Sequence, residues 1–325
     1  MTSLRDLGEF GLIRRLTCGL PESGAVVQGV GDDCAVVRVG ERLLLVSTDA
    51  CVEDVHFSRR TASPADIGWK AAAAAVSDIA AMGGEARYVL VSLACPVDIP
   101  AEVLDGLYGG IREAVDACGA VIIGGDTTES LARMVLDVVV IGETAEGRYR
   151  LRRGARPGDV LAVTGYPGRS AAGLLALELG VRAPALTEAH LRPRPRLAEG
   201  RWLALREEVH ALIDVSDGLA QDAAHIAEAS DAGADIDPET LPVAPVLEEY
   251  RGVLGIAPRD LILAGGEDYE LAMAIDGDAC EDLLRDFRAA FATPITAVGR
   301  FTAAPKGIRI AGAVPEMSGF DHFRR

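Results

Sequence analysis

The sequence contains no hydrophobic run long enough to cross a lipid bilayer, which takes about 20 apolar residues. The 325 residues are 49% hydrophobic and 25% charged, the balance of a globular protein. The first residues carry Asp6, Glu9 and Arg14 within their apolar pattern, unlike a signal peptide. We therefore expect a cytoplasmic protein with no membrane partner.

Positive charge is also scarce, and the formal net charge is −17. Such a chain would repel nucleic-acid phosphates instead of neutralising them, so we expect no nucleic-acid partner. A phosphate-bearing ligand would need a counter-ion on this acidic protein. A divalent cation is the simplest candidate.

Closely spaced cysteine pairs are absent. None of the six cysteines shows C-x-x-C spacing, and most have apolar neighbours. This pattern argues against a structural zinc site and indicates free thiols in a reducing compartment.

The familiar nucleotide-binding motifs are missing as well. No G-x-x-x-x-G-K-[ST] sequence occurs, which excludes a P-loop. Residues 29–34 begin like G-x-G-x-x-G but lack the third glycine and place Asp32 and Asp33 where pyrophosphate would lie, so a dinucleotide site is not expected. Residues 165–170 follow a predicted strand and open a helix, which fits either an anion cradle or a plain turn.

What the chain does contain is an alternation of strand-like and helix-like segments, typical of an α/β or α+β protein. Predicted strands cover 43–46, 88–94, 121–123, 134–141, 160–164, 211–213 and 271–275, and predicted helices cover 66–82, 101–118, 170–179, 219–229 and 280–290. The length allows two domains. A basic, turn-rich segment at 146–159 places their boundary near residue 148, giving domains 1–147 and 148–325.

Aspartates and glycines recur just after predicted strands, at 31–33, 47–49, 124–128, 214–218 and 265–268. Each group alone fits a turn or a helix cap. Together, carboxylates at strand ends can converge on one edge of a sheet, and Mg²⁺ and Ca²⁺ prefer such oxygen ligands. Asp78 lies within an apolar helix pattern, where a carboxylate needs a cation or hydrogen-bond donors.

The five histidines show neither metal-ligand spacing nor a catalytic triad. We expect His190 in a proline-rich turn and His225 on a polar helix face. His56 follows soon after Asp49 and is either a phosphate or substrate contact or a structural histidine.

The whole chain resembles the thiamine-monophosphate kinases, in the superfamily of aminoimidazole ribonucleotide synthetase and selenophosphate synthetase. The segments that carry the resemblance run in order from residue 8 to residue 323 and include GVGDDCAVV, STDACVEDVHF, VSDIAAMGG, GGDTT, RRGARPGD, DVSDGLAQD, GGEDYEL and GFDHF. STDACVEDVHF and GGEDYEL are the most specific to the kinases.

The resemblance implies a homodimer in which the N-terminal domains form a shared β-barrel, with a C-terminal α/β domain covering each site. It implies phosphorylation of thiamine monophosphate by ATP with several Mg²⁺ ions. The implied Mg²⁺ ligands are Asp33, Ser47, Thr48, Asp49, Asp78, Asp126, Asp214 and Asp217. The implied ATP contacts are Tyr108, Gly125, Asp126, Arg153 and Ser216, and the implied contacts to thiamine monophosphate are His56, Glu267 and Phe320.

Two phosphates repel each other, so catalysis requires positioning and charge neutralisation. We expect direct in-line transfer, in which Asp49 and Asp126 act with metal ions and Arg153 adds a fixed cation. Three positions depart from the family pattern. Ala75 stands where relatives usually have asparagine, Arg169 where many have aspartate, and Phe320 where tyrosine or tryptophan is usual.

Two alternatives remain open. One is a related ATP-using enzyme of the same superfamily that acts on another substrate, such as an aminoimidazole ribonucleotide precursor; Glu267 and the terminal aromatic segment would discriminate. The other is a non-catalytic acidic metal-binding protein that keeps only the fold, which would be expected to have lost several of these aspartates.

Overall fold

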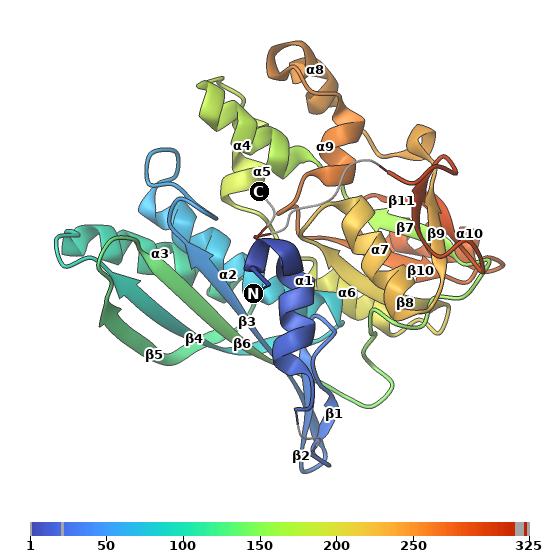
Figure 1. The fold of residues 1–325 in the computed structure, drawn as a ribbon, viewed down its shortest axis with the longest axis horizontal. Coiled ribbons are helices and arrows are strands. Elements are labelled where there is room, and N and C mark those ends of the chain that lie inside the picture. The colour runs from blue at the N-terminus through green and yellow to red at the C-terminus, as the bar shows by residue number, and fades with distance from the viewer. Residues whose placement is uncertain (1, 21–22, 316–321, 324–325) are drawn as a thin grey trace.

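The computed structural model describes residues 2–20, 23–315 and 322–323, which form two six-stranded sheets, one in each half of the chain (Figure 1). The first has the order β1-β2-β3-β6-β4-β5, with β1 (Val26–Gln28), β2 (Ala35–Val39), β3 (Arg42–Val52), β4 (Glu85–Cys95), β5 (Val121–Glu129) and β6 (Val135–Thr144). The second has the order β12-β9-β11-β7-β10-β8, with β7 (Val160–Thr164), β8 (Val209–Val215), β9 (Gly233–Ile236), β10 (Glu270–Ile275), β11 (Ile295–Thr302) and β12 (Gly307–Ile310). The expected two-domain α/β class is confirmed.

Two helices, α2 (Pro64–Ala81) and α3 (Ala101–Ala117), pack on one face of the first sheet. The helix α2 begins after Ser63, whose hydroxyl accepts a hydrogen bond from the N–H of Asp66 at 3.2 Å. Its run of alanines favours helix, and their small side chains make the helix narrow. Gly83, with φ 71°, follows the end of the helix. The same helix also contacts α6 (Leu197–Ala204) and β8, so it joins the two domains.

The backbones of α2 and α3 touch where they cross. A Cβ atom on Gly110 of α3 would lie 1.8 Å from the carbonyl oxygen of Ala65, and one on Gly68 of α2 would lie 2.0 Å from that of Leu107. Both distances are far below van der Waals contact, so only glycine allows this approach.

Helices cover both faces of the second sheet. Alternation along β7 sends Leu161 and Val163 into one core and Val160 and Ala162 into the other. The first core includes residues of α4 (Arg169–Leu179), α5 (Pro184–Leu191), α7 (Leu219–Ala229), α8 (Pro245–Leu254) and α9 (Pro258–Ala264), and the second includes residues of α6 and α10 (Cys280–Ala290). A short 3₁₀ helix, η1 (Pro238–Thr240), follows β9.

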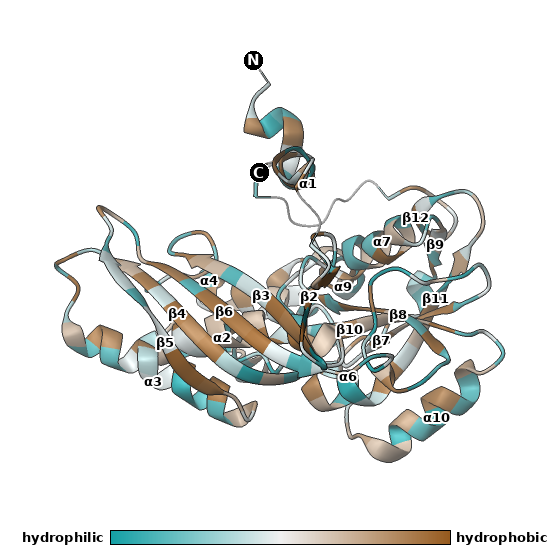
Figure 2. Cartoon of the chain, turned by 90° about the horizontal axis from the view of Figure 1, so that it is seen from below, coloured by the Kyte–Doolittle hydropathy of each residue, from teal (hydrophilic) through white to brown (hydrophobic). Residues whose placement is uncertain are grey.

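The other face of the first sheet is open. Tyr88 in β4 and Val121 and Ile123 in β5 are 41%, 53% and 55% exposed, and Figure 2 shows hydrophobic residues along β3, β4 and β6. An apolar sheet face of this kind is typical of a surface that another chain covers.

Two predicted strand ends were wrong. The strand β3 continues through Ser47, Thr48 and Asp49 because it pairs with β6 as far as Val52. Similarly, β5 continues through residues 124–128 because it pairs with β4 as far as Glu129. These polar residues therefore lie within strands. The predicted domain boundary near residue 148 lies between the end of β6 and the start of β7 and stays a prediction.

The helix α1 (Leu4–Thr17) stands off from both sheets (Figures 1 and 2), and its Glu9 accepts a hydrogen bond from the N–H of His322 at 3.4 Å. A capping box between Ser3 and Asp6 begins it, and half of its 14 residues are exposed. Among the described residues, no helix combines the length and apolar character that a membrane span requires.

The crossing of α2 and α3 predicts that alanine substitutions at two neighbouring glycines change the free energy of unfolding in opposite directions. Gly110→Ala should lower the free energy of unfolding by about 1–3 kcal/mol because the added methyl group overlaps the Ala65 carbonyl. Gly109→Ala is the matched control, because its Cβ would meet no atom within 4 Å, and it should stabilise α3 by roughly 0.5–1 kcal/mol. Urea denaturation measures both, and equal effects would contradict the close approach.

Candidate active site

A cavity of about 980 Å³ lies between the two domains. The first half of the chain contributes α1, residues 30–32, β3, residues 54–62 and α2 to its wall. The second half contributes α4, α5, the end of β8 and the start of α7, and residues 264–269. A cavity built by two domains is a common place for a small-molecule site.

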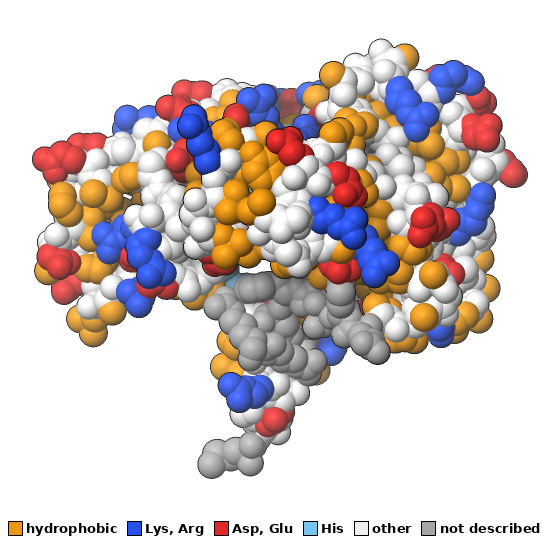
Figure 3. Space-filling view, turned by 90° about the horizontal axis from the view of Figure 1, so that it is seen from above, with side chains coloured by type: hydrophobic (Ala, Val, Ile, Leu, Met, Phe, Trp, Pro, Cys, Tyr) orange, Lys and Arg blue, Asp and Glu red, His pale blue; other side chains and the backbone are white. Residues whose placement is uncertain are grey.

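The outer surface on the face drawn in Figure 3 carries charged side chains of both signs. Acidic and basic side chains are interspersed on the face shown in Figure 3. On that face the net charge of −17 is thus not gathered into one patch. A separate group of carboxylates gathers at the cavity.

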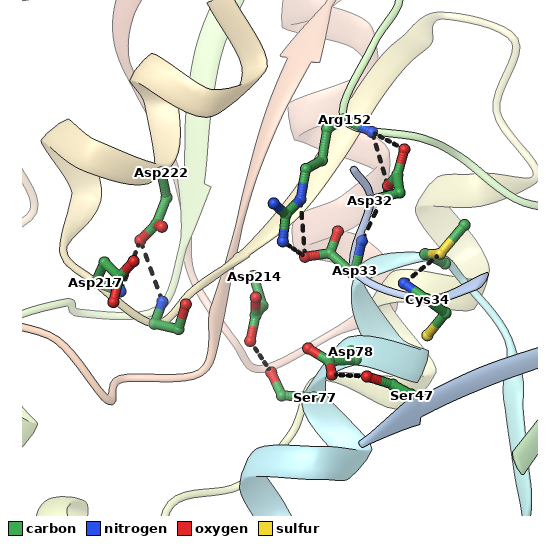
Figure 4. Close-up of polar contacts among 12 residues, drawn as sticks. Asp32, Asp33, Cys34, Ser47, Ser77, Asp78, Arg152, Asp214, Asp217 and Asp222 are labelled. Carbon is green, nitrogen blue, oxygen red and sulfur yellow. Dashed lines mark hydrogen bonds and ion pairs between the residues drawn. The ribbon is translucent and has the colours of Figure 1, made fainter. Parts of the chain in front are cut away.

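Three carboxylates meet in the cavity region although they are far apart in the sequence (Figure 4). Asp33 lies just before β2, Asp78 in α2 and Asp214 in β8, and one oxygen of each lies within 4.8 Å of the other two. Burial, together with the charge of Asp33, raises the pKa of Asp214 to about 7. Burial and the two neighbouring carboxylates raise the pKa of Asp78 well above its usual range.

Polar neighbours hold two of these carboxylates in place. Ser77 Oγ donates a hydrogen bond to Asp214 Oδ2 at 2.6 Å, and Arg152 Nη2 donates to Asp33 Oδ1 at 2.6 Å (Figure 4). The other oxygen of Asp33, Oδ2, is buried and has no hydrogen-bond partner in the part of the chain that the structure describes. Oxygen donors that include an unsatisfied buried carboxylate oxygen fit a divalent cation such as Mg²⁺.

The strand β3 distributes its polar residues between the two faces of the sheet. Ser47 and Asp49 share the face that α2 covers, where the Ser47 hydroxyl donates to Asp78. Thr48 lies on the open face and donates to Asp137 of β6 at 2.6 Å. Burial is the main cause that raises the pKa of Asp49 to about 6, with nearby carboxylates adding to it. Thr48 and Asp49 both line the cavity, and they lie in the part of β3 beyond Val46, where its pairing with β2 has ended.

The structure does not bring four of the predicted nucleotide contacts to the cavity wall: Tyr108, Gly125, Asp126 and Arg153. Asp126 is exposed on β5, in register with Ser92 of β4, which pairs with Asp137 of β6. Asp126, Asp137 and Thr48 therefore share the open face of the first sheet.

Ser216 and Asp217 line the cavity in the turn after β8. Asp222 of α7 fixes this turn by accepting hydrogen bonds from the N–H groups of Ser216 at 3.1 Å and Asp217 at 3.2 Å. His225 also lines the cavity, with its ring 4.6 Å from that of Phe10 in α1. His225 lies on the same polar face of α7 as Asp222, as predicted, and α1 partly covers that face.

The predicted substrate contacts His56 and Glu267 meet a buried lysine. Lys70 Nζ lies 2.6 Å from Glu267 Oε1 and donates to the carbonyl oxygen of His56 at 3.3 Å. Burial alone would raise the pKa of Glu267, but Lys70 and His190 hold it below its ordinary value. His190, predicted in a turn, is instead buried in α5. Phe320 lies outside the described residues.

The contacts at the start of α4 bear on whether residues 165–170 form an anion cradle or a plain turn. Asp268 accepts hydrogen bonds from the N–H groups of Gly168 at 2.6 Å and Ser170 at 3.1 Å. The anion at this helix N-terminus is therefore a carboxylate of the protein itself, and burial raises its pKa to about 7.

Sequence reasoning missed Lys70, Arg152, His190 and Asp137. Lys70 could have been found by the argument used for Asp78, since it is also a charged residue in an apolar helix pattern. Arg152 and Arg153 are adjacent, and no pattern in the sequence indicates which one turns inward. The pairing of Asp137 with Thr48 depends on strand register, which the sequence does not reveal.

Comparison with known proteins gives consistent matches over the whole chain. The family "AIR synthase related protein, N-terminal domain" matches residues 31–144, and its C-terminal counterpart matches residues 156–312. Thiamine-monophosphate kinase from Bacillus subtilis is 37% identical over 98% of this chain and 100% of its own, and that from Escherichia coli K12 is 36% identical over 97% and 98%. The solved complex of AaThiL with AMPPCP and TMP aligns over 99% of both chains with a TM-score of 0.88 and 33% identity.

The raised pKa of Asp214 predicts how cation binding depends on pH. Because its folded pKa of about 7 exceeds the unfolded value of ~3.9, the stability it contributes is present at low pH and is lost as the pH rises through 7. Mg²⁺ binds the ionised carboxylates and stabilises by ~2.7 kcal/mol at 100 times its Kd. Scanning fluorimetry should therefore show a larger Mg²⁺-induced rise in Tm at pH 8 than at pH 6.

Asp214→Asn is the control for this measurement, because it removes the titrating carboxylate and should shrink the difference between the two pH values. A rise in Tm that is the same at pH 6 and pH 8 in the unmodified protein would show that the cation does not bind these carboxylates.

Proposed function

We propose, because the chain belongs to the thiamine-monophosphate kinase family, that it transfers the γ-phosphoryl group of ATP to thiamine monophosphate, giving thiamine diphosphate and ADP. The related AaThiL was solved with AMPPCP, an ATP analogue, together with TMP. That complex aligns with nearly the whole of this chain, so both ligands have a counterpart region here.

One observation carries the proposal: Asp33, Asp78 and Asp214 converge beside a cavity that both domains build. A volume of about 980 Å³ is large enough for two phosphorylated ligands side by side. Burial, together with neighbouring carboxylates, raises the pKa values of Asp78 and Asp214, which means that the protein alone does not balance their charges.

Mg²⁺ would balance those charges. We propose Asp33, Ser47, Thr48, Asp49, Asp78, Asp126, Asp214 and Asp217 as its ligands, shared among several ions. The buried, unsatisfied Asp33 Oδ2 supports this donor set. When bound, Mg²⁺ supplies charge neutralisation at the phosphate oxygens and lets two anionic groups approach.

The protein's own residues orient the two substrates. Arg152, held by Asp33, places one fixed cation in the cavity wall, and Arg153 is proposed to add another at the nucleotide. Lys70 and Glu267 line the region assigned to thiamine monophosphate. A carboxylate there suits the positive charge of a thiazolium ring, since opposite charges attract strongly in a buried site.

We propose direct in-line transfer without a phosphoenzyme. His190 is engaged at both ring nitrogens, with Nε2 3.3 Å from Lys70 Nζ and Nδ1 3.1 Å from Ser170 Oγ. His56 accepts a hydrogen bond from the N–H of Val52 through Nδ1 at 2.9 Å. These contacts argue against either ring as a phosphate carrier. We propose that His56 instead contacts thiamine monophosphate together with Glu267, since both residues line the cavity.

A homodimer would explain why four residues predicted to contact the nucleotide do not line the cavity of a single chain. We propose that the open face of the first sheet pairs with a second copy in a shared barrel, as its exposed Tyr88, Val121 and Ile123 favour. Asp126 lies on this face, and Tyr108, Gly125 and Arg153 are proposed to contact ATP in the dimer. We also propose a cytoplasmic location, which the free state of all six cysteines supports.

A related activity on another phosphorylated substrate is the second candidate. Glu267 in the cavity wall favours thiamine monophosphate over a neutral or anionic base. A non-catalytic role is disfavoured because every position proposed for metal binding still carries an oxygen ligand.

The assay for this proposal uses purified protein with ATP, Mg²⁺ and either thiamine monophosphate or aminoimidazole ribonucleotide precursors. We expect thiamine diphosphate and ADP in equal amounts, followed by chromatography. Consumption of ATP with only the other acceptor would exclude thiamine monophosphate as the substrate. Consumption with neither acceptor would exclude a kinase that acts on either of them.

Asp49→Asn tests the metal assignment within this activity. The variant keeps the shape of the side chain but removes its charge, so kcat should fall by roughly 100-fold or more. Its Tm should not fall, because burial already penalises the ionised carboxylate. Asp116→Asn, at an exposed position of α3, is the matched control and should keep kcat. Near-normal turnover in Asp49→Asn would show that this carboxylate holds no essential metal.

A further inference from the structure

Lys70 is an unusual residue in this protein. It is one of two lysines, the other being Lys306, among 32 Lys and Arg residues, so arginine is the cation at almost every other position. It is also buried, with 7% of its surface exposed, within the alanine-rich helix α2. A buried ammonium is costly unless hydrogen-bond acceptors surround it, so its partners indicate its role.

The ammonium group of Lys70 has three donors and three acceptors within reach. Its Nζ lies 2.6 Å from Glu267 Oε1, 3.3 Å from the carbonyl oxygen of His56 and 3.3 Å from His190 Nε2. His190 accepts at Nε2 only if it is neutral with its proton on Nδ1, which faces Ser170 Oγ at 3.1 Å. Burial, together with Lys70, lowers the pKa of His190 to about 4, consistent with the neutral ring.

Arginine could not make this set of contacts. A guanidinium group is planar and wider, and its donors point outward in one plane. The three acceptors around Lys70 come from three different segments: the loop after β3, the helix α5 and the loop before β10. A compact ammonium on a flexible stem suits such a site.

The backbone of Glu267 is held in a strained conformation. Its φ angle is 62°, in the left-handed region that residues with side chains rarely adopt. The Glu267 N–H donates to the carbonyl oxygen of Ser216 at 2.8 Å, and the Tyr269 N–H donates to that of Val215 at 2.9 Å. These bonds fix the backbone, while the ion pair with Lys70 fixes where the carboxylate points.

Lys70 also connects the two sides of the cavity. His56 belongs to the first half of the chain and Glu267 to the second, and both line the cavity. Lys70 touches both from α2, the helix that joins the domains. It therefore sets the spacing between two residues that the proposed function assigns to the same substrate.

We infer that Lys70 is a positioning residue for the thiamine side of the active site, because it holds the Glu267 carboxylate and the His56 backbone at a fixed separation and orientation. This inference rests on the proposed function, in which Glu267 and His56 contact thiamine monophosphate. Lys70 acts through them, and the nucleotide side does not depend on it.

The experiment is steady-state kinetics on the full-length protein with both substrates varied, for the unmodified chain, Lys70→Met, Lys70→Arg and Lys306→Met. Methionine keeps the length of the side chain and removes its charge. Lys70→Met should raise the KM for thiamine monophosphate about tenfold or more, as expected when a buried charge pair is broken, while the KM for ATP changes by less than about threefold. Lys70→Arg should rescue this KM in part.

Lys306→Met is the matched control, since it makes the same substitution at an exposed lysine that pairs with Asp231 on the surface. It should leave both KM values unchanged. Equal increases in both KM values for Lys70→Met, or no change in the KM for thiamine monophosphate, would overturn the positioning role.

A double-mutant cycle with Glu267→Gln separates positioning from a structural effect. If Lys70 acts through Glu267, Lys70→Met should add little to the KM of Glu267→Gln. The double variant removes both charges of the pair and so leaves neither of them buried without a partner. It can therefore be compared with Glu267→Gln even if Lys70→Met alone does not fold. If the two substitutions instead raised the KM for thiamine monophosphate independently, so that their effects multiplied in the double variant, the inference would be overturned.

Calorimetric titration with thiamine monophosphate distinguishes a failure of this inference from a failure of the proposed function. An unmodified protein that binds and phosphorylates thiamine monophosphate, with a Lys70→Met variant that binds it equally well, contradicts only the role of Lys70. An unmodified protein that neither binds nor phosphorylates it contradicts both.

Discussion

The mutual repulsion of buried carboxylates is the constraint on which the site depends. Asp33, Asp78 and Asp214 come from a loop, a helix and a strand, and the fold holds their oxygens within 4.8 Å of one another. The raised pKa values of Asp78 and Asp214 show that this arrangement opposes ionisation in the protein alone. Packing elsewhere must therefore supply the stability that keeps the three together, and a divalent cation bound there, as we propose, would relieve the repulsion.

The helix α2 supplies much of that packing. Its alanines and Gly68 allow close contact with α3 on one side, and it contacts the second domain on the other. Both of its central charged residues point into the region between the domains, where Asp78 serves the proposed metal site and Lys70 the proposed thiamine side. One narrow helix of 18 residues thus places an anion and a cation in two adjoining parts of a single cavity.

The fold class and the importance of Asp78 could be predicted from the sequence, because periodicity and a charge in an apolar helix are local signals. The resemblance named several residues that line the cavity, including Asp49, Asp214 and Glu267. Strand ends were predicted less well, because the pairing that extends β3 and β5 involves distant segments. The choice between Arg152 and Arg153, and the approach of His190 to Lys70, depend on tertiary packing that no local pattern encodes. For the same reason, the open sheet face became visible only in the structure.

The three converging aspartates are proposed to bind a divalent cation beside the phosphates. The most direct measurement is anomalous diffraction from a crystal of this protein grown with Mn²⁺, AMPPCP and thiamine monophosphate, since Mn²⁺ accepts the same oxygen ligands as Mg²⁺. We expect an anomalous peak in contact with oxygens of Asp33, Asp78 and Asp214. Ordered nucleotide in the cavity with no metal peak at these three carboxylates would contradict it.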